Sequence, residues 1–470
     1  MSVKMYYSVY ILLTIVGLVC GQFDNDETNI PTYTPEDTEG MGEALFLTPY
    51  IRSGDIETAQ DLALVRHPKL EWLTSYSGFL TVNRNYASNL FFWFCKAKEN
   101  SEDAPVILWL QGGPGFTSLY GMFYENGPFY LTPELDFPPR EHSWHLDHNI
   151  IYIDNPVGAG FSFTESEYGY SNNEMELAEN LYRGLQQFFT LFPELRSNAF
   201  YLCGESFAGK YVPALGYLIH QKNPTAEENQ FINLRGLSIG NGLSDPINQI
   251  RRSEYVYQIG LIDVHGKEML EAAEDNCIQE IENGNQRAAF HTFNNMLFAR
   301  NSILKNLTRL PELYNFVNSQ EDVYPAFSAF LKNPEIRNAI HVGGRAFTGI
   351  SFNNQAANHL IDVYMNSVVE YISELLSHYP MFFYSGQLDI EISYISTVRF
   401  LEKMEFKDRE DYLSAPRHIW RVDGRVAGYT KQAGNLYDIL VRNAGHMAPL
   451  DQPKWCLDLI LHLTYGKTFE

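Results

Sequence analysis

A serine between two small residues, Gly204 and Ala208, is the strongest chemical signal in the sequence. An apolar run leads into a Gly-Glu-Ser-Phe-Ala segment centred on Ser206, and a helical pattern over 211–221 follows. A sharp strand-to-helix turn of this kind lifts a serine hydroxyl clear of a sheet, and small neighbours permit the tight backbone. We therefore predict that Ser206 is a nucleophile rather than an ordinary helix-capping serine.

A general base and an orienting acid must accompany such a serine, because a neutral hydroxyl is a weak nucleophile. In sites with this type of turn they follow in the order Ser, Asp, His. Asp389 stands in a loop after the apolar run 381–384, and His446 stands in a Gly- and Pro-bounded loop after the run 436–441. We expect Asp389 and His446 to complete a catalytic triad.

A glycine-rich loop at 112–115 follows another apolar run, 106–110. Acyl transfer requires hydrogen-bond donors aimed at the developing oxyanion. We expect these donors to be the backbone N–H groups of Gly113 and Phe207. A phosphate-binding loop is disfavoured, because the Gly-x-x-x-x-Gly-Lys-Ser/Thr pattern is absent and Pro114 has no N–H.

Short apolar runs bounded by turn residues predict the sheet that positions these side chains. Continuous hydrophobicity is typical of central strands covered on both faces. Ser171 and Glu174 stand at capping-box spacing ahead of a helix that Pro193 ends, and this strand–helix–strand order predicts parallel strands and an α/β fold. The predicted strands are 90–95, 106–110, 150–153, 199–203, 237–239 and 381–384.

The stretch 245–345 differs from its surroundings, since it is helix-like, charge-rich and without a strand run. We interpret it as a helical cap inserted between two parts of one core, 42–244 and 346–470. Residues 421–429 and 436–441 predict a late antiparallel hairpin that turns at a Gly-Asn pair.

The N-terminus predicts a secretory signal peptide over 1–21, with Lys4 ahead of an apolar run, 6–19, and small Gly21 at its end. The run is shorter than the ~20 apolar residues that a membrane span needs, which disfavours an anchor. A flexible acidic leader is expected over 22–41, because that segment is poor in apolar residues.

Signal removal would leave four cysteines in an oxidising compartment, where sparse disulfides and small buried core residues are both open interpretations. These cysteines are Cys95, Cys203, Cys277 and Cys456. The sequon at Asn306 predicts N-glycosylation.

The charge and the length of the chain limit the classes of binding partner and the number of domains that we expect. The chain has 470 residues, and 34 Lys and Arg against 57 Asp and Glu give a net charge of -23, which argues against nucleic acid and acidic membranes as partners. The length would allow about three domains of ~150 residues. The order of the motifs favours one large enzyme, because Ser206 and His446 must meet across the inserted segment.

Taken together, these segments resemble the serine carboxypeptidase family. Gln111 in the glycine loop and the Gly-Gln-Leu-Asp segment ending at Asp389 look most like its vitellogenic carboxypeptidase-like branch. The resemblance runs from Ser75 to Gln452 and includes the stretches 154–162, 240–246 and 451–453. It implies an α/β-hydrolase fold: a mixed, mostly parallel sheet with helices on both faces and a helical cap insertion.

The resemblance also implies the reaction, which is removal of the C-terminal residue of a peptide through an acyl-enzyme, without a cofactor or a metal. Family members bind the substrate's free carboxylate with residues that match Gln111, Gly112, Glu125 and Glu205. Two carboxyls facing a third cannot all be ionised, so we expect raised pKa values for Glu125 and Glu205 and tighter binding at acidic pH. The family commonly has Asn where this chain has Gln111, which keeps the amide but moves it by about one bond length.

Two alternatives to hydrolysis keep the same scaffold. Relatives include acyltransferases that pass the acyl group to an alcohol, and a secreted binding or storage protein would use the fold without catalysis. An intact triad argues against the second. In each case the signal peptide directs the protein to the secretory pathway, and from there outside the cell or to an acidic, lysosome-like vesicle.

Overall fold

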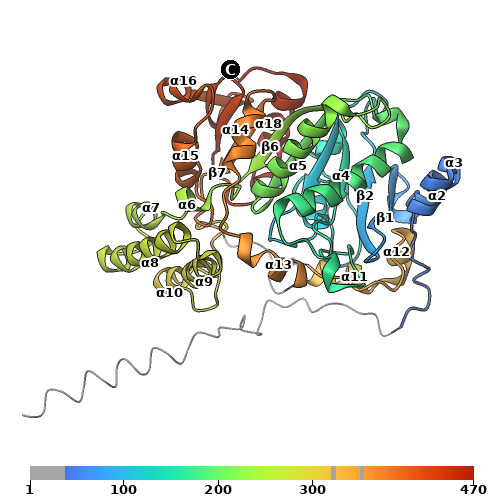
Figure 1. Cartoon of the computed structure of the whole chain (residues 1–470), viewed down its shortest axis with the longest axis horizontal. Coiled ribbons are helices and arrows are strands. Elements are labelled where there is room, and N and C mark those ends of the chain that lie inside the picture. The colour runs from blue at the N-terminus through green and yellow to red at the C-terminus, as the bar shows by residue number, and fades with distance from the viewer. Residues whose placement is uncertain (1–36, 319–323, 350–353, 470) are drawn as a thin grey trace, which may run out of the picture.

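The structure, a computed structural model, describes residues 37–469 apart from 319–323 and 350–353 (Figure 1). The predicted signal peptide and most of the predicted leader lie outside the described residues. A ten-stranded sheet in the order β1-β2-β4-β3-β5-β6-β7-β10-β9-β8 forms the centre of the molecule. Its strands are β1 (Ser75–Asn83), β2 (Ser88–Cys95), β3 (Val106–Leu110), β4 (Asn149–Ile153), β5 (Phe200–Glu205), β6 (Leu234–Gly240), β7 (Met381–Gly386), β8 (His418–Val422), β9 (Arg425–Ala433) and β10 (Leu436–Val441).

The six central strands, from β4 to β10 in the sheet order, run parallel, and the outer strands on both sides are antiparallel. Each of the six apolar runs that predicted a strand matches one of β2 to β7, with only Ala199 outside its strand. The two strands that flank the predicted helix, β4 and β5, are parallel as expected, but β3 lies between them. The predicted mixed, mostly parallel sheet is confirmed.

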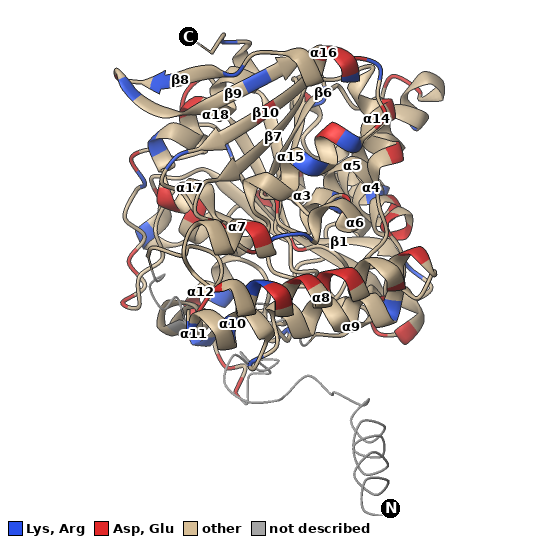
Figure 2. Ribbon diagram, turned by 90° about the vertical axis from the view of Figure 1, so that its left-hand side faces the viewer, with Lys and Arg blue, Asp and Glu red and all other residues tan. Residues whose placement is uncertain are grey.

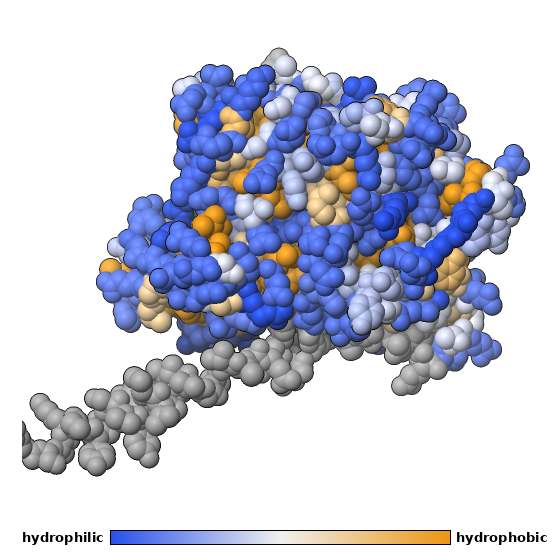
Figure 3. All heavy atoms as spheres, viewed as in Figure 1, coloured by the Kyte–Doolittle hydropathy of each residue, from blue (hydrophilic) through white to orange (hydrophobic). Residues whose placement is uncertain are grey.

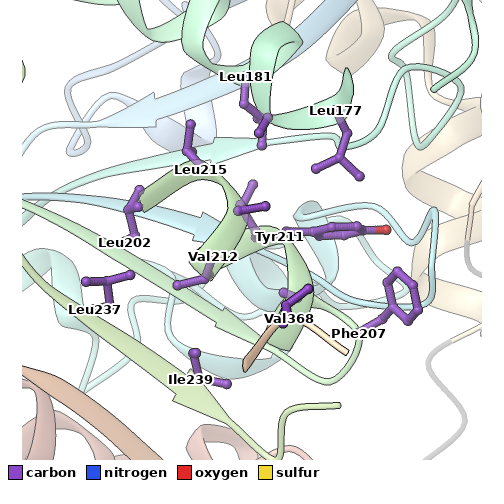
Figure 4. Close-up of a cluster of buried hydrophobic side chains, with 14 of the residues drawn as sticks. Leu177, Leu181, Leu202, Phe207, Tyr211, Val212, Leu215, Leu237, Ile239 and Val368 are labelled. Atoms are coloured by element: carbon purple, nitrogen blue, oxygen red, sulfur yellow. The ribbon is translucent and has the colours of Figure 1, made fainter. Parts of the chain in front are cut away.

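Successive strand residues face opposite sides of the sheet, and both sides are covered by helices. Leu108 and Leu202 belong to one buried cluster, whereas Ile107 and Cys203 belong to the other. Helices α4 (Glu174–Leu191), α5 (Ala208–Lys222) and α14 (Val369–Leu376) contribute to the first cluster, and α18 (Pro453–Tyr465) contributes to the second. Figure 4 shows side chains of β5 and β6 facing those of α5, with two leucines of α4 above them.

The helix α4 begins differently from our prediction. The N-cap is Asn173, whose side chain accepts a hydrogen bond from Glu176 N at 3.0 Å. The Glu176 carboxylate accepts in turn from the backbone N–H of Asn172, the residue before the N-cap. Glu174 Oε1 instead lies 3.5 Å from the buried ammonium group of Lys210, with which it forms an ion pair. The Ser171–Glu174 capping box that we predicted is therefore wrong.

The described parts of the chain between β6 and β7 form helices joined by turns, and no strand. Those within the predicted cap are α6 (Pro246–Gln249), α7 (Ser253–Gln258), α8 (Val264–Glu282), α9 (Gln286–Leu297), α10 (Ile303–Thr308), α11 (Tyr324–Lys332) and α12 (Pro334–Ala339). Figure 2 shows acidic residues along α8, in keeping with the charge-rich sequence. Helical structure continues past Arg345 into α13 (Gln355–His359) and α14, and the boundary of the insertion stays a prediction.

The remaining helices lie near the two ends of the chain: α2 (Thr48–Ser53), α3 (Ile56–Ala63), α15 (Tyr394–Lys403), α16 (Arg409–Ser414) and α17 (Ala448–Asp451). The late hairpin is formed by β9 and β10 and turns after Ala433. Our boundary for its first strand was wrong, because a turn at Asp423 and Gly424 divides 421–429 between β8 and β9. A positive φ of 74° at Gly424 suits that tight turn.

All four remaining cysteines are buried free thiols, so of the two interpretations the structure supports small core residues. Burial raises the pKa of the Cys95 and Cys203 thiols, which keeps them uncharged. None of the helices formed by the described residues combines the length and the apolar character needed to cross a bilayer. The face in Figure 3 is mainly hydrophilic, with apolar side chains scattered over it.

Candidate active site

Ser206 occupies a strained turn between β5 and α5. Its φ is 62°, a left-handed value that is uncommon for a residue with a side chain. Its N–H donates to Gly240 O at 2.9 Å, and its carbonyl accepts from Gly209 N and Leu243 N. These bonds hold the turn, and the Ser206 residue stays partly exposed while both its neighbours in sequence are buried.

Glycines are required around this turn because backbone segments approach it closely. A Cβ on Gly204 would lie 2.7 Å from Leu110 O. A Cβ on Gly112 would lie 2.5 Å from Phe207 N, a contact that real side chains do not make. The glycine loop is therefore packed directly against the serine turn.

Asp389 and His446 are brought together at the carboxyl ends of β7 and β10. His446 Nδ1 lies 2.7 Å from Asp389 Oδ2, and both side chains are buried. The two loops meet closely, since a Cβ on Gly386 would lie 1.9 Å from Gly445 O. The structure thus places side by side two residues that the sequence separates by 57 positions.

Asp389 is held by four hydrogen bonds. Its Oδ1 accepts from the backbone N–H groups of Glu391 at 2.7 Å and Ile392 at 3.1 Å. Its Oδ2 is shared between His446 Nδ1 and Asn241 Nδ2, the latter at 2.6 Å. Donors on both oxygens fix the orientation of the Asp389 side chain toward His446.

Three residues near this pair were missed by our sequence analysis. Asn241 lay within a stretch that we quoted, at a strand end, but we gave it no role. Tyr314 stacks on the His446 ring with centroids 4.8 Å apart, and its carbonyl accepts from His446 N. Glu391 is buried close by and interacts electrostatically with His446. The position of Asn241 after β6 could have been a signal, whereas no pattern in the sequence points to Tyr314.

Burial lowers the pKa of His446, but the nearby carboxylates outweigh it. The charges of Asp389 and Glu391, and the hydrogen bond that His446 donates to Asp389, raise that pKa to about 9. The pKa of Glu391 is itself raised to about 7, mainly by burial. Protonation of Glu391 below this value removes one of the charges that raise the pKa of His446.

The second ring nitrogen, His446 Nε2, is buried and makes no hydrogen bond with any residue that the structure describes. The Ser206 Oγ to His446 Nε2 hydrogen bond of an assembled triad is therefore not formed here. Both residues nevertheless follow parallel strands at the same edge of the sheet. At this edge the last residues of β5 and β6, Glu205 and Gly240, pair with each other, and so do those of β7 and β10, Gly386 and Val441. In ligand-free sites such bonds often tighten only when substrate binds.

The two expected oxyanion donors are available. Within the described part of the chain, neither Gly113 N nor Phe207 N donates a hydrogen bond. Gly113 has a φ of 107°, a conformation that suits glycine and that turns the loop beside Ser206. Both N–H groups border the serine turn, because Gly112 contacts Phe207 N and the Ser206 side chain.

A pair of buried carboxyls, Glu125 and Glu205, lies next to the serine turn. Gln111 links them to the sheet, since its Nε2 donates to Glu205 Oε1 at 3.1 Å and its Oε1 accepts from Trp109 Nε1 at 3.0 Å. If both carboxyls were ionised, both oxygens of Glu125 and one of Glu205 would lack a hydrogen-bond donor among the described residues. A proton shared between the two carboxyls would satisfy one oxygen of each.

The pKa values follow from this arrangement. Burial raises the pKa of Glu125 to about 7. Burial and the charge of Glu125 hold the pKa of Glu205 well above its usual range. The pair therefore retains a proton in the acidic range and becomes doubly charged only above neutrality.

The remaining predicted site residue, Asn306, lies far from these groups in sequence, on α10. Its side chain is exposed, and its Nδ2 donates to Asn301 O at 2.9 Å. Exposure is compatible with glycosylation, which stays a prediction.

The sheet order, the strained serine between β5 and α5 and the Asp–His pair after β7 and β10 define an α/β-hydrolase. A solved structure supports this fold: the prohormone-processing carboxypeptidase Kex1Δp from Saccharomyces cerevisiae matches with a TM-score of 0.73 at 20% identity, over 87% of this chain and 95% of that chain. At this identity the likeness concerns the fold alone.

Residues 68–466 match the family model of the serine carboxypeptidases, and the chain belongs to that family. Among its relatives are the vitellogenic carboxypeptidase of Aedes aegypti, 47% identical over 90% of each chain, and the venom serine carboxypeptidase of Apis mellifera, 44% identical over 93% of this chain and 95% of the other. The human probable serine carboxypeptidase CPVL is 42% identical over 91% of each chain. The protein is a hydrolase of the serine carboxypeptidase type, as the motifs predicted.

Proposed function

We propose that Ser206, His446 and Asp389 form the catalytic triad that removes the C-terminal residue of a peptide. His446 Nε2 takes the proton of the Ser206 hydroxyl as Oγ attacks the last peptide carbonyl carbon. Asp389 holds the Nδ1 proton and stabilises the imidazolium. The observation that carries this proposal is the buried Asp389–His446 hydrogen bond at the same sheet edge as the strained serine.

The remaining steps follow the usual acyl-transfer sequence. The N–H groups of Gly113 and Phe207 donate to the negatively charged oxygen of the tetrahedral intermediate. The C–N bond breaks as His446 gives its proton to the departing amino group, which leaves an ester on Ser206. Water then attacks the ester with His446 again as base, and the shortened peptide is released.

Specificity for a free C-terminus is proposed to come from the Glu125–Glu205 pair, with Gln111 and Gly112. A carboxylate approaching two ionised carboxyls would be repelled, whereas a pair that keeps its proton can donate a hydrogen bond to it. Because the pKa of Glu125 is about 7, the binding form predominates below neutrality.

The same protonation acts on His446. The charges of Glu125 and Glu391 contribute to the raised pKa of His446, and both carboxyls are protonated below about pH 7. Acid therefore removes two of the charges that raise this pKa, whereas the charge of Asp389, which contributes more, remains. Support for a carboxypeptidase that prefers acidic pH comes from carboxylate binding by the Glu125–Glu205 pair.

A C-terminal amide is expected to be a poor substrate. Conversion of the C-terminal carboxylate of an N-blocked dipeptide to an amide removes the charged group that the Glu125–Glu205 pair would bind. Hydrogen bonds to charged groups contribute about 1.5–3 kcal/mol each. We expect kcat/KM at pH 5 to fall on the order of 10²-fold relative to the free acid. Following amino acid or amino acid amide release by chromatography measures this, and equal rates would contradict carboxylate recognition.

The double variant Glu125→Gln/Glu205→Gln tests the carboxyl pair. For the wild type, KM should rise about tenfold between pH 6 and 8, because a group with a pKa near 7 is mostly ionised at the higher pH. Neutral amides do not titrate, so the variant should lose this rise. Glu402→Gln, an exposed change on α15, is the matched control and should keep it. A rise that persists in the double variant would sink the assignment.

We also propose passage through the secretory pathway. The predicted signal peptide and the exposed Asn306 sequon support it, and relatives carry the descriptions vitellogenic and venom in their names. Release from the cell and delivery to an acidic vesicle both remain consistent with this route. The substrate class is peptide C-termini.

A further inference from the structure

Two histidines and a glutamate converge on the surface where α5 meets α14. His220 Nε2 lies 3.8 Å from Glu374 Oε1, and His378 Nε2 lies 3.5 Å from the same oxygen. One ligand atom from each of the three residues lies within 4.8 Å of the other two, and no other group of this kind occurs among the residues that the structure describes. The two imidazole rings are 4.3 Å apart between centroids.

Two imidazole nitrogens and a carboxylate oxygen form a ligand set that suits Zn²⁺. Bond lengths of about 2.0–2.2 Å in a tetrahedral site place ligand atoms ~3.4 Å from one another, close to the two distances above. The side chains of Glu374 and His378 are 49% and 45% exposed, so an ion can enter from solvent and a water can take the fourth position.

The packing of the two helices holds these ligands in place. Tyr217 and Tyr371 stack with centroids 4.8 Å apart, and His220 and Glu374 each follow three residues later, one turn along the same faces. Figures 1 and 2 both show α5 and α14 side by side. Two of the three ligands thus lie on the packed helices, and His378 lies in the turn directly after α14.

A tyrosine orients one of the imidazoles. His220 Nδ1 lies 3.1 Å from Tyr379 Oη. The tautomer with its proton on Nδ1 donates to that oxygen and presents the Nε2 lone pair to Glu374. Metal-ligating histidines almost always donate a hydrogen bond from the ring nitrogen that does not bind the metal. An ion pair between a surface histidine and a glutamate does not require this second hydrogen bond.

Electrostatics also favour one metal ion bound by both histidines over a separate proton on each of them. Two imidazolium groups with ring centroids 4.3 Å apart would repel each other. Two neutral imidazoles can instead share one divalent ion beside the Glu374 carboxylate.

We propose that His220, Glu374 and His378 bind one Zn²⁺ ion, which links the end of α5 to α14. The site is structural rather than catalytic, because α5 (Ala208–Lys222) starts next to Ser206 and His220 lies near its other end, roughly 20 Å along the helix. It is independent of the proposed catalytic roles.

Titration of metal-stripped protein with ZnCl₂ in a calorimeter at pH 7.5 tests the site. We expect one ion per chain with a Kd on the order of micromolar. His378→Ala and Glu374→Gln should weaken binding about tenfold or more, because each removes one of three ligands. Circular dichroism melts without metal check that both variants fold, and Zn²⁺ should raise the Tm of the wild type alone.

Two further variants separate this site from general metal binding to surface histidines. Tyr379→Phe removes the oxygen that orients His220 and should weaken Zn²⁺ binding about tenfold. His265→Ala, an exposed histidine on α8, is the matched control and should bind as the wild type does. Absence of saturable binding, or an affinity that is unchanged in both His378→Ala and Glu374→Gln, would overturn the proposal.

Discussion

The Ser206→Ala variant is expected to lose kcat/KM by a factor on the order of 10⁵–10⁶, because removal of a triad serine abolishes the covalent route. The substitution removes one oxygen from a partly exposed residue, so the fold should survive. Release of the C-terminal amino acid from an N-blocked dipeptide at pH 5, followed over hours, measures the residual rate. Thermal unfolding of the same sample verifies that the protein is folded.

A second serine provides the matched control. Ser238 lies on the neighbouring strand β6, and its buried hydroxyl has no hydrogen-bond partner among the described residues. Ser238→Ala removes an equivalent oxygen from the same sheet and should keep wild-type activity. If Ser206→Ala retained more than about one per cent of the activity, another nucleophile would have to be sought.

Asp389→Asn should lower kcat about 10⁴-fold, the loss known for this type of change in a serine triad. An asparagine can present an N–H to His446 Nδ1, so the imidazole proton moves to Nε2. Nε2 can then no longer accept the proton of Ser206. The backbone N–H groups of Glu391 and Ile392 donate to Asp389 Oδ1, so they favour the oxygen of the new side chain at that position and leave its NH2 group facing His446.

The pH profile distinguishes this tautomer effect from general damage. Without the Asp389 charge, a main contribution to the raised pKa of His446 is lost, so the dependence of kcat on the His446 titration should move to lower pH. Asp438→Asn is the control, since Asp438 is a buried aspartate on β10 that bonds to Tyr394 and Tyr412. A wild-type pH profile in Asp389→Asn would contradict the assigned role.

Residues that follow strand ends could be predicted to lie together. Ser206, Asp389 and His446 each come a few residues after an apolar run, and parallel strands bring such positions to one edge of a sheet. The structure joins Asp389 to His446, and the catalytic roles stay a proposal. The central strands were predictable for the same reason, because residues buried on both faces leave a continuous apolar run.

Other features depend on contacts that no local pattern carries. Tyr314 comes from the long segment between β6 and β7 and reaches His446 only through the fold. The cap of α4 could not be assigned uniquely from the sequence, since both Ser171 and Asn173 can cap a helix. In the structure Glu174 forms an ion pair with the buried Lys210, and Asn173 is the N-cap. Likewise, nothing in the sequence relates His220 to His378 before α5 and α14 are packed.

The central claim is that Ser206 is the activated nucleophile of this carboxypeptidase. The direct measurement is labelling of the purified protein with a fluorophosphonate, followed by mass spectrometry of the digested chain. The account predicts one adduct per chain, on the peptide that contains Ser206, with loss of activity in proportion to labelling. An unlabelled Ser206 in active enzyme, or a stoichiometric adduct on a different residue, would contradict it.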